Sequence, residues 1–68
     1  MYESKPEEIQ NAKNIILKII NKWIILDSIE LSILAKEILG VSYSIGEGYN
    51  ESTIRQIAEV KIEEKYGL

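Results

Sequence analysis

Apolar residues in the first third of the chain recur at helical spacing and cover more of the helix than one core needs. One face of a predicted helix over residues 6–24 carries Ile9, Ala12, Ile16, Ile19, Ile20 and Trp23. Ile15, Leu17 and Ile24 extend this face on both sides, to an apolar arc of roughly 200°. A helix with so wide an arc is either central in its fold or partly covered by a second chain.

A second helix is predicted over residues 28–39. Asp27 and Ser28, with Glu30 in the first turn, form a variant of the capping box and mark its start. Gly40 is expected to end it as a C-terminal cap. The main apolar face of this helix consists of Leu31, Leu34, Ala35 and Ile38.

A third helix is predicted over residues 51–66, because Asn50 and Ser52 are both good N-caps. Before it, residues 40–50 form an extended, glycine-containing connection, and the alternation within 41–45 is also typical of a short strand. Residues 58–63 alternate as well, so they fit a strand that pairs with 41–45. Their Glu and Lys content and the N-cap favour the helix.

The predicted fold is therefore an all-α, three-helix, single domain that spans residues 1–68. Ile29 and Ile33 stand one turn apart on the second helix, outside its core face, with Glu30 and Glu37 on one side and Ser32 and Lys36 on the other. Apolar surface beyond the needs of the core usually marks an interface. The predicted interaction surface comprises Ile15, Leu17, Ile24, Ile29 and Ile33.

The residue inventory restricts the chemistry of the chain. With 68 residues and neither His nor Cys, it lacks the usual metal ligands and the usual proton-transfer residue. We therefore expect no enzymatic activity, metal or cofactor. The opening Met1-Tyr2-Glu3 lacks the features of a signal peptide, which favours a cytoplasmic protein. The abundance of Ile, Glu and Lys is typical of a thermophile source.

Part of the chain, residues 34–68, resembles helix-turn-helix and winged-helix domains. Residues 34–42 (LAKEILGVS) are similar to the first helix and turn, and residues 52–59 (STIRQIAE) to the start of a recognition helix. The resemblance implies base contacts from Ser52, Thr53, Arg55 and Gln56.

The sequence departs from this family at several points. Nine residues, Tyr43 to Glu51, replace a tight turn, and no wing follows Leu68. The candidate recognition helix is net acidic and the whole chain carries a net charge of −3, which disfavours nucleic acid as a partner.

A second resemblance centres on Ser28. Residues 26–31 (LDSIEL) resemble the site at which acyl carrier proteins receive phosphopantetheine, which implies that Ser28 would carry the arm. An ordinary helix N-cap explains the same residues, and the connection before Ser28 is shorter than in that family.

The sequence favours a non-enzymatic protein–protein interaction module, either a small accessory subunit or an adaptor. Its expected partner is another protein chain or a second copy of itself, in a homodimer, and a membrane is not expected. The alternative is a DNA-binding regulator of the helix-turn-helix type. A carrier protein modified at Ser28 is the third interpretation.

Overall fold

Three helices account for most of the residues that the computed structural model describes, 5–20 and 26–67. They are α1 (Pro6–Ile20), α2 (Ser28–Ser44) and α3 (Glu51–Tyr66). No strand occurs in these described ranges, so the prediction of an all-α, three-helix fold is confirmed. The end of the predicted first helix, residues 21–24, lies outside the described residues.

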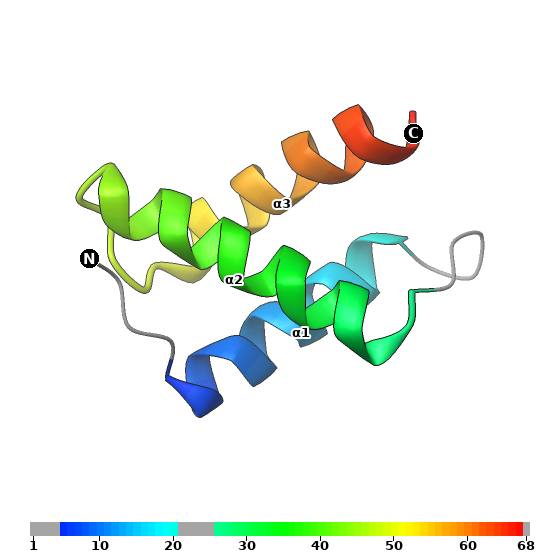
Figure 1. Cartoon of the computed structure of the whole chain (residues 1–68). Coiled ribbons are helices and arrows are strands. Elements are labelled where there is room, and N and C mark those ends of the chain that lie inside the picture. Colours follow the sequence, from blue (N-terminus) through cyan, green and yellow to red (C-terminus); the bar gives the residue numbers. More distant parts are fainter. Residues whose placement is uncertain (1–4, 21–25, 68) are drawn as a thin grey trace.

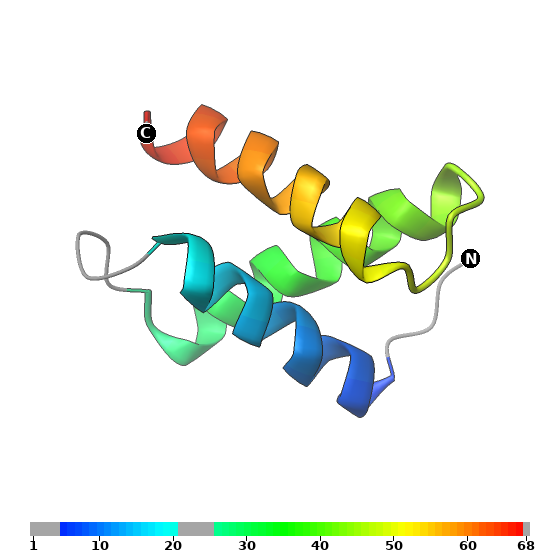
Figure 2. The ribbon, with the colours of Figure 1, turned by 180° about the vertical axis from the view of Figure 1, so that it is seen from behind.

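Helices α1 and α3 run side by side in the same direction, and α2 crosses both of them diagonally (Figure 1). Seen from behind, α1 and α3 lie in front and α2 passes behind them (Figure 2). Each helix packs against the other two. The arrangement leaves one side of the α1–α3 pair facing away from α2.

The core lies between the three helices and consists of short and branched aliphatic side chains. Each helix contributes one alanine with no exposed surface, namely Ala12, Ala35 and Ala58. The larger buried apolar residues of the described part are Ile16, Ile20, Leu34, Ile38, Leu39, Ile54 and Ile62. Further residues pack half-buried against this core, among them Leu31 of the predicted core face of the second helix and Ile57 of α3.

The helix starts follow the predicted capping residues. The Asp27 side chain accepts a hydrogen bond from the Glu30 backbone N–H at 2.8 Å, which is half of a capping box. The Asn50 side chain accepts from the backbone N–H groups of Ser52 and Thr53, at 3.1 and 3.4 Å. These side chains satisfy donors that the first turn of a helix leaves unpaired.

The predicted end of the second helix is wrong. Helix α2 continues through Gly40 to Ser44, so residues 40–44 are neither an extended connection nor a strand. Gly40 does not adopt a positive φ, and a Cβ there would meet nothing within 4 Å. It is an ordinary helical residue, and the left-handed conformation occurs only later, at Gly46 with φ 85°.

Ser42, in the last turn of the continued helix, is bonded to the connection that follows it. It lies on the core face of α2, fully buried, and its hydroxyl donates to the Gly48 carbonyl at 2.6 Å. The Glu47 backbone N–H donates back to the Ser42 carbonyl at 3.0 Å. This pair of bonds folds residues 45–50 into the short connection that precedes α3.

The third helix has the predicted bounds. Residues 58–63 are helical throughout, so the alternative of a strand paired with 41–45 is excluded. Its C-terminal cap is Gly67, with φ 70°, whose backbone N–H donates to the Glu63 carbonyl.

The core predicts large stability losses on truncation. Leu34→Ala and Ile16→Ala should each lower the free energy of unfolding by about 2–5 kcal/mol, because these side chains are 2% and 0% exposed. Val60→Ala, at a side chain 54% exposed, should change it by no more than about 0.5 kcal/mol. Chemical denaturation of the variants measures both effects, and similar losses at Leu34 and Val60 would contradict the described packing.

Gly40 predicts a stabilising substitution. Gly40→Ala should raise the free energy of unfolding by about 0.5–1 kcal/mol, because alanine favours the helix and no atom crowds the new Cβ. The matched control is Gly46→Ala, which should destabilise the protein because its φ of 85° strains any side chain. Thermal or chemical denaturation distinguishes the two signs, and a destabilised Gly40→Ala variant would refute the continuous helix.

Candidate functional site

The largest exposed apolar side chains of α1 and α2 belong to the predicted interaction surface. Leu17 is 50% exposed, Ile29 71% and Ile33 49%. Ile15 is half-buried and packs against the core, so its role is partly structural. Ile24 lies outside the described residues. The wide apolar arc of the sequence is therefore divided between the core and the surface.

Ile29 and Ile33 form what we call the α2 ridge. The two residues lie one turn apart, and Ile33 stands about 200° around the helix from the buried Ala35. The ridge therefore points away from the core. Glu30 and Lys36, on its two sides, are also exposed.

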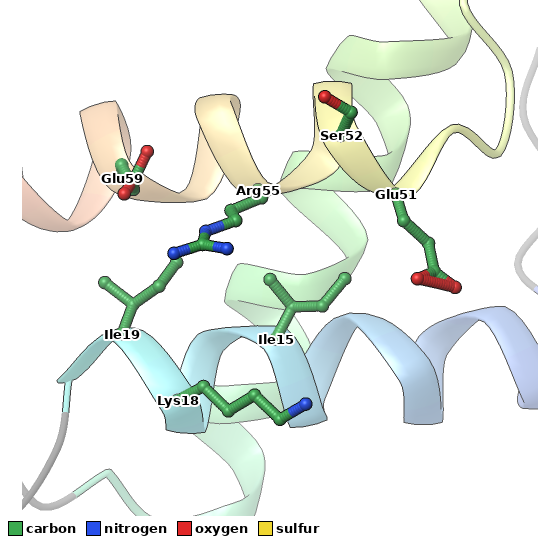
Figure 3. A pocket seen from close by; sticks show the side chains of 7 residues that line it. All are labelled: Ile15, Lys18, Ile19, Glu51, Ser52, Arg55 and Glu59. Carbon is green, nitrogen blue, oxygen red and sulfur yellow. The ribbon is translucent and has the colours of Figure 1, made fainter.

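A second surface lies between α1 and α3, and we call it the α1–α3 groove. It has a volume of about 600 Å³ and is lined by Ile15, Lys18, Ile19, Glu51, Ser52, Arg55 and Glu59. Ile15 and Ile19 rise from α1 toward α3, and the Arg55 side chain extends from α3 toward Ile19 (Figure 3). Glu51 points from α3 toward α1 in the same view. The groove thus has an apolar floor on α1 and charged walls.

Sequence reasoning missed this groove, because it depends on how two helices distant in the sequence are placed. It also missed the exposure of Ile45 and Val60, which are 59% and 54% exposed. Ile45 is the C-cap of α2, and Val60 lies about 200° from the buried Ala58 on α3. Single exposed apolar residues of this kind are ordinary on protein surfaces.

The structure places three of the four predicted DNA-contacting residues on one side of α3, because Ser52, Arg55 and Gln56 are three and four residues apart and all are exposed. Ser52 and Arg55 line the α1–α3 groove, and Gln56 is exposed. The Thr53 hydroxyl instead donates to Glu47 Oε1 at 3.1 Å, in the connection before α3. Thr53 is therefore bonded to the connection, while the other three stay accessible to solvent, and contact with DNA stays a prediction.

Arg55 has acidic neighbours along α3. Glu51 lies one turn before it and Glu59 one turn after it, and both line the same groove. A second, smaller cavity of about 210 Å³ lies between α2 and α3, lined by Leu34, Glu37, Lys61, Glu64 and Lys65. Both surfaces of α3 thus mix the two charge signs.

Ser28 is the first residue of α2 and is exposed. The hydrogen bond from the Glu30 N–H to the Asp27 carboxylate accounts for the neighbouring acidic residue as a helix cap. Modification of Ser28 stays a prediction.

A polar cluster links the start of α1 with the end of α2 and the start of α3. The Tyr43 hydroxyl donates to Glu8 Oε1 at 2.9 Å, and the Tyr49 hydroxyl donates to Glu51 Oε2 at 3.3 Å. Burial raises the pKa of Tyr49 above its ordinary value of 10.0, and the Glu51 and Glu8 carboxylates add to this rise. A hydrogen bond from the Asn11 side chain opposes it. The Tyr43–Glu8 bond joins the end of α2 to the start of α1, whereas the Tyr49–Glu51 bond is local to the connection and the first turn of α3.

The described residues offer no metal centre and no membrane span. In residues 5–20 and 26–67, His, Cys, Asp and Glu side chains form no group of three that could hold a metal ion. None of the described helices is long and apolar enough to cross a membrane. Comparisons of the chain with protein-family models, with curated proteins and with solved structures found no match. Evidence for a function therefore comes from the surfaces of the chain itself.

The raised pKa of Tyr49 predicts a loss of stability at alkaline pH. Above pH 10.0 the unfolded chain releases the phenol proton while the folded chain still keeps it, so unfolding becomes more favourable as pH rises. Below that pH the contribution of Tyr49 is fully present. Tyr49→Phe should therefore reduce the alkaline loss, as measured by denaturation from neutral to alkaline pH.

Tyr66→Phe is the matched control, and it should leave the alkaline contribution of Tyr49 in place. Equal effects of the two substitutions on the pH dependence would contradict the role given to Tyr49.

Proposed function

We propose that this chain is a non-enzymatic protein–protein interaction module, a small accessory subunit or adaptor that acts in the cytoplasm. The observation that carries the proposal is the exposure of the α2 ridge, with Ile29 at 71% and Ile33 at 49%. Leu17, half exposed on α1, adds to the uncovered apolar surface. We assign the interaction to these three residues.

The ridge contributes little to folding of the single chain. Burial of apolar surface stabilises by about 25 cal/mol per Å², and a side chain that stays exposed gains little of this. The core is complete without the ridge, because each helix already buries its own inward-facing residues. Ile29 and Ile33 would gain their stabilisation when another protein surface covers them.

The charged residues of the groove support a binding role over a catalytic one. All four charged residues of the groove are exposed to solvent, namely Lys18, Glu51, Arg55 and Glu59. Acid–base catalysis by carboxylates generally uses an environment that shields one of them from water. Exposed carboxylates beside exposed cations are instead suited to orienting a partner surface.

A photo-crosslinking amino acid tests the proposal directly. Placed at Ile33, in the full chain, it should form protein adducts in extracts of the native source or with a second copy. The same group at Gln56, on the exposed surface of α3, is the matched control and should form far fewer. Adducts at Ile33 should decrease when unlabelled chain is added, because the site is saturable.

Two outcomes would contradict the interaction module. One is an absence of protein adducts at Ile33 both in extracts and with the purified chain. The other is equal labelling from Ile33 and Gln56, which would indicate random collision.

The proposal also predicts the outcome of a DNA-binding experiment. A random duplex should show no measurable binding at ~150 mM salt, because binding at that salt needs several phosphate contacts. The chain carries a net charge of −3, and Arg55 stands between Glu51 and Glu59. A gel-shift titration measures this. Sub-micromolar binding that Arg55→Ala abolishes would favour the helix-turn-helix regulator instead.

A further inference from the structure

The α2 ridge and the α1–α3 groove lie on opposite sides of the molecule. The groove opens on the side of α1 and α3 that faces away from α2, as the close view with α2 behind it shows (Figure 3). The ridge lies on the side of α2 that faces away from the core, about 200° from Ala35. One copy of the chain thus presents a protruding surface on one side and a concave surface on the other.

The apolar parts of the two surfaces match in spacing. Ile29 and Ile33 of the ridge are four residues apart on α2, and Ile15 and Ile19 of the groove are four residues apart on α1. Rows of side chains at this spacing pack into one another at helix–helix contacts. The groove, at about 600 Å³, has room for two branched side chains from another helix.

The charges beside the two surfaces are also complementary. The ridge has Glu30 and Glu37 on one side and Lys36 on the other. The groove has Lys18 on its α1 side, and Glu51, Arg55 and Glu59 on its α3 side, which is net negative. A ridge that enters with its acidic side toward α1 places Glu30 near Lys18, and Lys36 near the α3 carboxylates. Opposite signs then face one another on both sides.

We propose that the α2 ridge of one copy occupies the α1–α3 groove of a second copy. This inference rests on the proposed function and identifies the partner as the chain itself. The contact joins two different surfaces, so each copy can both insert its ridge and receive one. Such a contact continues past the dimer, or closes into a ring, whereas a symmetric contact stops at two copies.

Two variants each disrupt one of the two surfaces that form this contact. The ridge variant carries Ile29→Ser and Ile33→Ser. The groove variant carries Lys18→Glu and Glu59→Lys, which place like charges opposite Glu30 and Lys36 of the incoming ridge. All four positions are exposed, so circular dichroism should show the original helix content in both variants. A control with Lys5→Glu and Glu63→Lys has the same net charge as the groove variant but alters exposed residues outside both surfaces.

Sedimentation velocity then gives a distinctive result. The original chain and the control should form either a closed ring or open assemblies that are larger than a dimer. Each variant alone should associate on the order of a hundredfold more weakly. An equal mixture should form a dimer and nothing larger, because the intact ridge of the groove variant fits the intact groove of the ridge variant.

Other outcomes would overturn the inference. A groove variant that dimerises alone, with no complex in the mixture, would indicate a symmetric contact between two ridges. An original chain that stays monomeric while Ile33 still crosslinks to another protein would leave the proposed function standing and refute self-association. A monomeric chain without any crosslinked partner would refute both proposals.

Discussion

Close packing at three alanines determines the architecture of this domain. Ala12, Ala35 and Ala58, one in each helix, are fully buried in the same core. Small side chains allow helices to approach closely, and the surrounding isoleucines and leucines then fill the space between them. The described core contains no fully buried aromatic side chain. It is filled by the short side chains of alanine, isoleucine and leucine, which pack between neighbouring helices. The outer faces of the helices remain outside it.

This core leaves apolar surface on two sides of the domain. The α2 ridge points away from the core. Ile15 and Ile19 lie at the margin of the core, in the α1–α3 groove. A chain of 68 residues buries only about 60% of the surface that its unfolded state exposes. A partner that covers the ridge would stabilise the folded state, because that partner would bind only the folded chain. Folding and partner binding are thus expected to be coupled.

Local signals predicted most of the fold. The Asp27 and Asn50 caps act through neighbouring backbone groups, and α2 and α3 begin where these residues predicted. The end of α2 involves a side-chain contact with the connection that follows it instead. Ser42 is polar, so the alternation around it resembled a strand, but its hydroxyl is satisfied by the Gly48 carbonyl inside the fold. The predicted cap at Gly40 is wrong because the φ of a glycine cannot be derived from the sequence.

The candidate surfaces were predictable to a different degree. Helical spacing alone placed Leu17, Ile29 and Ile33 outside the core, and their exposure agrees with that. The groove could not be predicted, because Ile19 and Arg55 are far apart in the sequence and meet only when α1 and α3 run side by side. The parallel course of these helices is a property of the whole arrangement.

The central claim is that the apolar surface outside the core is an interface. Sedimentation equilibrium of the unaltered chain, from low micromolar to millimolar concentration, tests it most directly. The account predicts an average mass that rises above that of the monomer as concentration increases, with unchanged helix content. A mass equal to the monomer at every concentration, together with no protein partner crosslinked at Ile33, would contradict it.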